Sequence, residues 1–328
     1  MAVSITSIAH YLPDNVVPNS YFESYLDTND EWIKTRTGIS ERRFELNGAT
    51  SDMIVRAAEK CIEKRGIDKS EIDCVIVATV TPDYMFPSTA ALVQSKLGLE
   101  NAWGFDISAA CSGYLFALAT AVNMVKSGGV KRVLLCGADK MSSIINMNDR
   151  SHCILFGDGA GVTLIEEIED EELGYKDDIL RVEGAGGKHL IQKAGGSAQP
   201  ATIETVQNNW HYVYQEGQPV FKSAVKGMAD VSKEIMDKNN LSSNDVAFLV
   251  PHQANMRIIS ATADRMGVSM DKVMVNIHKY GNTTAATIPI CLSEWYENKQ
   301  IKKGDNLILS SFGAGFTWGA IWLKWSMD

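Results

Sequence analysis

The stretch Gly104–Val125, GFDISAACSGYLFALATAVNMV, predicts a strand that passes into a buried helix at the centre of a large fold. A short β-rich run ends at Ile107, small residues follow, and the segment from Cys111 onward is apolar on nearly all sides. The first N–H groups of a helix lack internal partners and carry the positive end of its dipole. Thiols at such places have pKa values of roughly 3.5 to 7.5. Cys111 is therefore a candidate nucleophile with a lowered thiol pKa, although a buried structural cysteine fits this stretch equally well.

The composition is that of an ordinary globular protein. The chain has 328 residues, of which 45% are hydrophobic and 22% charged, and this length suits one large core or two domains. The net charge of −9 argues against general binding to nucleic acid or to anionic membranes. We find no apolar run long enough for a transmembrane helix and no secretory signal, so we expect a cytoplasmic protein. The six cysteines stand singly, without zinc-site spacing, so we expect free thiols and no metal.

Strand-like and helix-like segments alternate along the chain. Apolar β-rich runs such as Cys74–Thr79 alternate with helical patterns such as Ser51–Arg65, which predicts a mostly parallel α/β sheet. Farther along, residues 219–239 have the pattern of a long amphipathic helix, and residues 271–277 that of a strand. The loop-rich stretch 184–218 has little periodicity, and we expect it to cover a site.

The same order of segments occurs twice, which indicates an internal duplication. An acidic, turn-prone segment at 166–178 divides the chain, and SNDVAFLV at 243–250 resembles SEIDCVIV at 70–77. We therefore predict two related halves, one at residues 1–172 and the other at residues 173–328.

Two polar residues of the second half stand at strand-to-helix turns that correspond to the turns of the first half. His252 follows the strand-like run 246–250, and Asn282 stands at a helix start in YGNTT. Ligands of open α/β sheets bind at such carboxyl ends, so we expect Cys111, His252 and Asn282 to meet. The turn FGAGF at 312–316 adds backbone N–H groups that could face a developing oxyanion. A core histidine and an N-cap asparagine are the alternative roles of His252 and Asn282 taken singly.

Two other motif-based interpretations agree less well with the sequence. The order and spacing of Cys, His and Asn also fit papain-like peptidases, but the Cys-Gly-Ser-Cys-Trp surroundings of that nucleophile are missing. GAGGKH at 184–189 lacks the first glycine and the Ser or Thr of a Walker-type phosphate loop.

Several motifs together resemble the β-ketoacyl-[acyl-carrier-protein] synthase III family. They are NDEWIKTRTGI at 29–39, SAACSG around Cys111, FGDGAG at 156–161, PHQAN around His252, YGNTTAATIP around Asn282 and GAGFTWG at 313–319. They occur in order over nearly the whole chain. The resemblance implies the thiolase fold, a duplicated α/β architecture of five αβαβα layers, in a homodimer. Asn282 stands where chain-elongating condensing enzymes have His, which favours the initiating class.

The activity implied by the resemblance is that of an acyltransferase that starts fatty-acid synthesis. Cys111 would attack an acyl-CoA and release CoA, and malonyl-[acyl-carrier protein] would then lose CO₂ and condense with the acyl group. His252 and Asn282 would donate hydrogen bonds to the enolate, and the N–H groups of Cys111 and Ala314 would hold the oxyanion. Most members have Gly where Ala314 stands. We expect no cofactor, because acyl-CoA and malonyl-carrier protein are substrates.

The resemblance also assigns binding residues. Those implied to contact CoA or acyl carrier protein are Thr28, Trp32, Arg36, Arg150, Lys222, Gln253, Asn255 and Arg257. Those implied to form the acyl pocket are Phe86, Met141, Phe156 and Phe312, with Phe86 closing the pocket of the partner subunit. A basic pair that helps some members to dock the acidic carrier protein is Asp264-Arg265 here, a departure that bears on docking strength.

Two rival hypotheses keep the same fold. One is a specialised ketide or alkylquinolone-type synthase that takes an unusual starter or malonyl-CoA. The other is a non-catalytic partner in a heterodimeric condensing complex. The complete set of Cys111, His252 and Asn282 favours a catalytic subunit.

Overall fold

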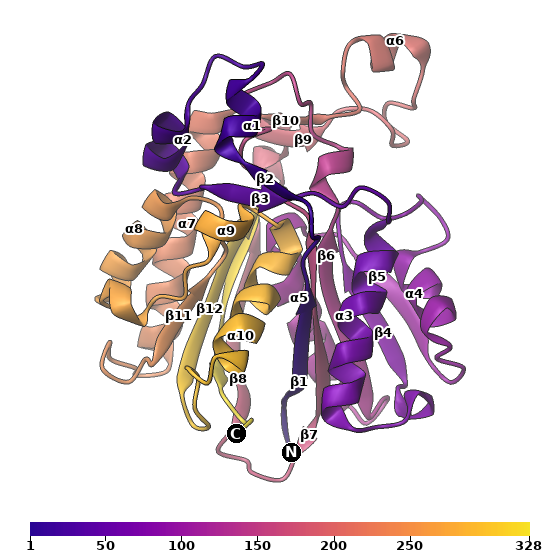
Figure 1. The fold of residues 1–328 in the computed structure, drawn as a ribbon. Helices are drawn as coiled ribbons and strands as arrows, with labels where there is room; N and C mark the ends of the chain where they lie inside the picture. Colours follow the sequence, from indigo (N-terminus) through magenta and orange to yellow (C-terminus); the bar gives the residue numbers. More distant parts are fainter.

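Two β-sheets and three layers of helices alternate across the molecule (Figure 1). The computed structural model describes all residues, 1–328. The helices α3 (Thr50–Arg65) and α4 (Thr89–Leu97) form the outer layer on the first sheet. The middle layer, between the sheets, consists of α5 (Gly113–Lys126) and α10 (Thr287–Glu297). The outer layer on the second sheet consists of α7 (Gly217–Lys238) and α8 (Met256–Met266). These layers confirm the predicted αβαβα architecture.

The two sheets have matching strand orders. The first contains, in spatial order, β1 (Ala2–Tyr11), β7 (Gly159–Ile168), β6 (Arg132–Asp139), β4 (Cys74–Ala78) and β5 (Trp103–Ile107). The second contains β8 (Gly174–Val182), β13 (Thr317–Lys324), β12 (Asn306–Gly313) and β11 (Phe248–Pro251). An isolated parallel bridge between Leu249 and Val273 stands where the second sheet would have its fifth strand.

Two pairs of equivalent strands have the same separation in the sequence. β4 and β11 begin 174 residues apart (248 − 74), and β6 and β12 have the same separation (306 − 132). Two related supersecondary units therefore pack face to face, as the repeat in the sequence predicted. The predicted boundary at residue 172 falls in the turn between β7 and β8.

The sheets are mixed, so the prediction of mostly parallel sheets was wrong. In the first sheet β4 pairs in parallel with β5 and β6, whereas β7 is antiparallel to both of its neighbours. In the second sheet only β11 and β12 are parallel. The reason lies in the connections: no α-helix separates β6 from β7 or β12 from β13, and strands joined without a crossover pair antiparallel. The strand predicted at 271–277 is reduced to the isolated bridge at Val273, between η5 (Met270–Lys272) and α9 (Ile277–Tyr280).

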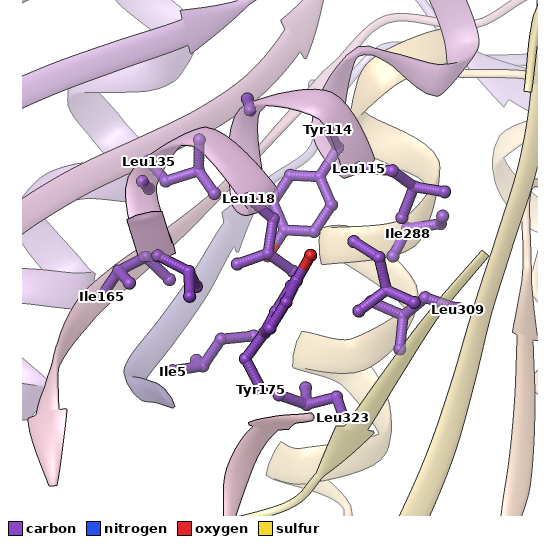
Figure 2. Close-up of a cluster of buried hydrophobic side chains, with 14 of the residues drawn as sticks. Ile5, Tyr114, Leu115, Leu118, Leu135, Ile165, Tyr175, Ile288, Leu309 and Leu323 are labelled. Atoms are coloured by element: carbon purple, nitrogen blue, oxygen red, sulfur yellow. The ribbon is translucent and has the colours of Figure 1, made fainter. Parts of the chain in front are cut away.

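The middle helices form the main core together with both sheets (Figure 2). This cluster includes Tyr114, Leu115 and Leu118 of α5, Ile288 of α10, Leu135 and Ile165 of the first sheet, and Leu309 and Leu323 of the second. A helix between two sheets has no solvent-facing side, which explains why α5 is apolar almost all round. Burying each large aliphatic side chain contributes about 1.5–3 kcal/mol, so this layer anchors the turn that precedes α5.

Short elements cover one end of the two sheets (Figure 1). They are β2 (Val16–Pro18), α1 (Asn19–Glu23), α2 (Asp30–Thr37), β3 (Glu41–Arg43), η4 (Gly184–His189), β9 (Leu190–Gln192), α6 (Ile203–Gln207) and β10 (Val213–Gln215). The stretch predicted to be loop-rich contains the antiparallel pair β9–β10, with α6 in the excursion between them. None of the helices combines the length and the hydropathy needed to cross a bilayer.

Candidate active site

Cys111 lies in a tight turn immediately before α5. The turn is the 3₁₀ segment η2 (Ala110–Ser112), and its first residue, Ala110, has a φ of 48°. The equivalent turn of the second half, η6 (Thr284–Ala286), precedes α10, and its first residue, Thr284, has a φ of 51°. Positive φ is uncommon for residues with a Cβ. Its recurrence at equivalent places indicates that both turns are held by the structure around them.

Strands of the second half hold the turn that carries Cys111. The hydroxyl of Ser311 in β12 donates to the carbonyl of Cys111 at 2.8 Å, and the hydroxyl of Thr317 in β13 donates to the carbonyl of Ala109 at 2.9 Å. Gly313 lies so close that a Cβ there would be 2.7 Å from the backbone nitrogen of Cys111. The nucleophile of one half is therefore fixed by backbone and side chains of the other.

The three side chains predicted to meet do so: Cys111, His252 and Asn282 line one cavity of about 480 Å³. His252 follows β11 directly, and Asn282 precedes η6, so both stand at the strand-to-helix turns from which they were predicted. Trp32, Arg36, Asn255 and Arg257 line the same cavity. Trp32 is 36% exposed, so the cavity connects the buried sulfur to the protein surface.

A second, mostly apolar cavity of about 220 Å³ also reaches Cys111. Its walls include Val80, Met141, Ile144, Phe156, Ile191 and Val213. Met141 and Phe156 were predicted pocket residues. The sequence did not single out the others as pocket residues, and two of them, Ile191 and Val213, lie on β9 and β10, which approach Cys111 only in the folded chain. The sulfur thus lies where a polar-rimmed channel meets an apolar pocket.

The environment of Cys111 contradicts the expected lowering of its thiol pKa. Burial raises the pKa of Cys111 to about 12, and the nearby Asp139 carboxylate adds to the rise. The Cys111 N–H and a hydrogen bond from the Asn282 side chain act in the opposite direction, but they are smaller. Desolvation of a thiolate outweighs the helix end, because the turn before α5 is enclosed by both halves. The resting nucleophile is therefore an uncharged thiol.

His252 is buried and uncharged at neutral pH. Burial lowers the pKa of His252 to about 3, because an imidazolium would be desolvated in this position. Its Nδ1 atom lies 2.8 Å from Oγ1 of Thr287, the first residue of α10. The same hydroxyl lies 3.1 Å from the Thr284 carbonyl. The sequence did not single out Thr287, which directly follows η6 and contacts His252 only through the packing of α10 against β11.

Asn282 has a fixed side-chain orientation. Its Oδ1 atom accepts the N–H of Thr284 at 2.9 Å, which leaves the amide N–H groups directed to other partners, Cys111 among them. Its backbone is also held, because its N–H donates to Leu155 at 2.8 Å and its carbonyl accepts from Gly157 at 3.0 Å. The amide therefore lies in the same cavity as Cys111, with its oxygen held by the turn and its NH₂ group turned away from that turn.

The two backbone groups predicted to bind an oxyanion lie beside the same cavity. Cys111 and Ala314 both line the apolar pocket, and neither N–H donates to a turn or loop carbonyl. Ala314 does not have a positive φ, so the replacement of the family's usual Gly causes no backbone strain.

Trp32 forms an aromatic platform between two arginines. The guanidinium of Arg150 lies 5.4 Å from the centre of the Trp32 ring, and that of Arg36 lies 5.7 Å away. Asn255 caps α8 and donates to the carbonyl of Arg36 at 2.9 Å. Arg257 lies 4.7 Å from the ring of Phe221. Cations and a flat aromatic ring at the mouth of a channel suit a nucleotide with phosphates.

The side chain of Gln253, a predicted binding residue, lines neither cavity. It is fully buried. Its Nε2 donates to the carbonyls of Pro251 and Met274 at 2.8 and 3.0 Å, and its Oε1 accepts from two backbone N–H groups. Because every polar atom is paired within the protein, Gln253 holds the loop after β11.

Five other predicted residues lie apart from the cavity to which they were assigned. Thr28, Arg150 and Lys222 line neither cavity, and Phe312 lines the larger cavity but not the apolar pocket. Phe86 is 85% exposed and reaches neither cavity of its own chain. In the pair that departs from the family pattern, Arg265 forms an ion pair with Asp230 at 3.3 Å.

A duplicated five-layer fold with Cys, His and Asn at the junction of two cavities defines a condensing enzyme of the thiolase fold. Models of 3-oxoacyl-[acyl-carrier-protein (ACP)] synthase III and of its C-terminal part match residues 105–182 and 236–325. A β-ketoacyl-[acyl-carrier-protein] synthase III of Chlorobium luteolum is 55% identical over 99% of this chain and 100% of its own length. One of Porphyromonas gingivalis strain W83 is 52% identical over 99% and 97%. The crystal structure of the Aquifex aeolicus VF5 synthase III superposes with a TM-score of 0.91 at 40% identity, covering 98% of this chain and 100% of that one.

The chain therefore belongs to the β-ketoacyl-[acyl-carrier-protein] synthase III family. It is a condensing acyltransferase of this family.

Proposed function

We propose that the chain catalyses the priming condensation of fatty-acid synthesis. An acyl-CoA and malonyl-[acyl-carrier protein] would yield a 3-oxoacyl-[acyl-carrier protein], CoA and CO₂. The observation that carries the proposal is the position of Cys111, where the channel from Trp32 meets the apolar pocket. A thioester entering through the channel would present its carbonyl to the sulfur while its acyl chain occupies the pocket.

The first half-reaction transfers the acyl group to Cys111. The sulfur attacks the thioester carbonyl, the carbon–sulfur bond to CoA breaks, and the thiol proton ends on the leaving CoA sulfur. No net charge has to remain in the cavity, which agrees with the raised pKa of Cys111 and the lowered pKa of His252. The N–H groups of Cys111 and Ala314 are the proposed donors to the oxyanion of this step.

The second half-reaction needs two neutral donors for an enolate. As the malonyl carbon–carbon bond breaks, CO₂ leaves and negative charge develops on the thioester oxygen. Asn282 would donate from its amide, and His252 from Nε2–H. The Thr287 hydroxyl is directed at the Thr284 carbonyl at 3.1 Å and lies 2.8 Å from Nδ1 of His252, so a proton on Nε2 requires this hydroxyl to donate to Nδ1 instead. The enolate carbon then attacks the acyl carbonyl on Cys111 and forms the new carbon–carbon bond. The carbon–sulfur bond to Cys111 breaks, and the sulfur takes up one proton from solvent to return to the thiol.

The channel mouth supports a role in binding CoA. Trp32 would stack on the adenine with Arg150 beside it, and Arg36, Asn255 and Arg257 would contact phosphates or pantetheine. The same channel would receive the pantetheine arm of acyl carrier protein after CoA has left. The proposed steps require no cofactor.

We also propose a homodimer formed through the edge of the first sheet. β5 pairs only with β4, so its other edge is free. Trp103 on this strand is 55% exposed, and Tyr84, Met85 and Phe86 are 63 to 85% exposed. A free strand edge and contiguous large apolar side chains are typical of an interface. Phe86 would then reach the acyl pocket of a second copy.

Initial rates with each extender test the proposed function. Purified protein is given one acyl-CoA and either malonyl-[acyl-carrier protein] or malonyl-CoA, and product is followed by mass spectrometry. We expect condensation with the carrier-protein thioester. Preferential use of malonyl-CoA would favour the specialised ketide synthase, and absence of product with both would favour a non-catalytic subunit. The variant Cys111→Ala is the control for both assays.

A further inference from the structure

Asp139 connects the two halves beside the active site. It is the last residue of β6 and is fully buried. Its Oδ1 atom accepts four hydrogen bonds from the loop after β4: from the hydroxyl of Thr79 at 3.0 Å, the N–H of Val80 at 2.8 Å, and the N–H and hydroxyl of Thr81 at 3.1 and 3.0 Å. All hydrogen-bond partners of Oδ1 therefore belong to the first half, which carries Cys111.

The other oxygen of Asp139 binds the second half. Oδ2 accepts from the hydroxyl of Thr284 and, at 3.2 Å, from the N–H of Ala285. The partners of the carboxylate are all neutral donors. A buried charge without a counter-ion is costly unless hydrogen bonds replace its hydration. The six hydrogen bonds of Asp139 join the end of β6 to the loop after β4 and to η6.

Thr284 links Asp139 to both side chains proposed to bind the enolate. Its N–H donates to Oδ1 of Asn282 at 2.9 Å. Its carbonyl lies 3.1 Å from the Thr287 hydroxyl, which is 2.8 Å from Nδ1 of His252. The φ of 51° is unfavourable for a β-branched residue, so Thr284 needs an external contact to stay in this conformation. The Asp139 carboxylate supplies that contact.

We propose that Asp139 is a positioning residue for the condensation, and that it acts through Thr284 by fixing the amide of Asn282 against Cys111. This inference rests on the proposed role of Asn282. Asp139 touches no substrate. Asp139 positions the second half, with the proposed enolate donors Asn282 and His252, relative to Cys111 in the first half.

The variant Asp139→Asn tests the proposal with little change in shape. Because the four donors at Oδ1 require an oxygen there, the new NH₂ group would take the position of Oδ2. Two hydrogen-bond donors, this NH₂ group and the N–H of Ala285, would then face each other. We expect kcat for condensation to fall by about tenfold or more while KM for acyl-CoA changes less than about twofold. Thr284→Val, which removes the hydroxyl, should act in the same direction, and Thr284→Ser should retain most activity.

Asp73 provides a matched control at the opposite end of the same strands. It precedes β4, and its Oδ2 accepts from the N–H groups of Lys131 and Arg132 at 2.7 and 2.8 Å. Asp73→Asn also removes one carboxylate that joins two strands, but it is remote from η6. We expect it to lower stability without changing kcat. An equal loss of kcat in Asp73→Asn and Asp139→Asn would overturn the proposal, because any strand-linking aspartate would then have the same effect.

A double-mutant cycle separates positioning from general damage. The rate of CO₂ release from labelled malonyl-[acyl-carrier protein] is measured in wild type, Asp139→Asn, Asn282→Ala and the double variant. If Asp139 acts through Asn282, its replacement costs less than about twofold once Asn282 is absent. A tenfold cost that persists in the Asn282→Ala background would overturn the proposal. Thr284→Val replaces Asp139→Asn in the cycle if the latter does not fold. A failure of the proposed function itself would differ, because wild-type protein would then release no CO₂.

Discussion

The side-chain oxygen of Thr287 lies 2.8 Å from Nδ1 of His252, on the first residue of the helix that follows Asn282. In the proposed mechanism an uncharged His252 donates from Nε2, and this contact can supply the tautomer that such a donor needs. When the Thr287 hydroxyl donates to Nδ1, the ring proton is on Nε2. In that arrangement the tautomer of His252 is set from α10, and Oδ1 of Asn282 is held by the turn before the same helix.

Replacing Thr287 with Val should damage decarboxylation more than acyl transfer. The variant keeps the shape of the side chain but removes control of the His252 tautomer, so we expect CO₂ release to slow by about tenfold. Acylation of Cys111, followed by mass spectrometry, should change much less. Thr287→Ser is the matched control and should behave as wild type. Equal effects of Thr287→Val on both steps would contradict tautomer control.

His252 should make folding stability depend on pH below neutrality. Its pKa is lowered to about 3 in the folded protein, whereas an unfolded histidine has a pKa of about 6.5. Between these values the unfolded chain binds the extra proton, so stability falls as pH falls through that window. At pH 5 the loss from this residue is on the order of 2 kcal/mol relative to pH 8. Urea unfolding at both pH values should show a smaller difference for His252→Gln than for wild type. An unchanged difference would show that the histidine is not desolvated.

Alkylation of Cys111 should reveal an unactivated thiol in the free protein. Because burial raises the pKa of Cys111 to about 12, the rate of reaction with iodoacetamide should rise with pH without a plateau up to about pH 9. Replacing Asn282 with Ala removes a group that lowers this pKa, so the rate should fall further. Peptide mapping assigns the adduct to Cys111. A plateau near neutral pH would mean that the helix end outweighs burial.

Removing the Trp32 ring should weaken binding of CoA esters specifically. Stacking of a base on an aromatic side chain is worth about 1–3 kcal/mol, so Trp32→Ala should raise KM for acyl-CoA by roughly tenfold with little change in kcat. An acyl-pantetheine, which has no adenine, is the matched control substrate. Its KM should be the same for wild type and variant. A fall in kcat with both substrates would place Trp32 in the support of the active site instead.

The proposed dimer interface can be tested at Trp103. This residue is more than half exposed in the single chain and lies on the free edge of β5. Replacement by Glu puts a charge into an interface that we propose to be apolar, which should shift the protein toward monomer in light scattering coupled to gel filtration. The exposed residue Ile203 on α6 is the control, and Ile203→Glu should leave the mass unchanged. A monomeric wild-type protein would contradict the proposal.

The parts of the fold that follow from local pattern were predictable. α5 is apolar all round because it packs between two sheets, and the repeated strand pattern indicated the duplication that brings Cys111, His252 and Asn282 together. Features that depend on burial and on contacts between distant segments could not be predicted from the sequence. The thiol pKa was expected to fall, because a sequence indicates where a helix begins but not how completely the turn is enclosed. Thr287 and Asp139 make their decisive contacts across 35 and 145 positions of sequence.

The acyl adduct is the most direct test of the central claim, which is that Cys111 carries the acyl group between two substrates. The protein is incubated with an acyl-CoA, digested and mapped by mass spectrometry before and after addition of malonyl-[acyl-carrier protein]. We predict that one acyl group appears on Cys111, that none appears in Cys111→Ala, and that the adduct is lost as 3-oxoacyl product forms. An adduct on another cysteine, or one on Cys111 that malonyl-[acyl-carrier protein] does not discharge, would contradict the account.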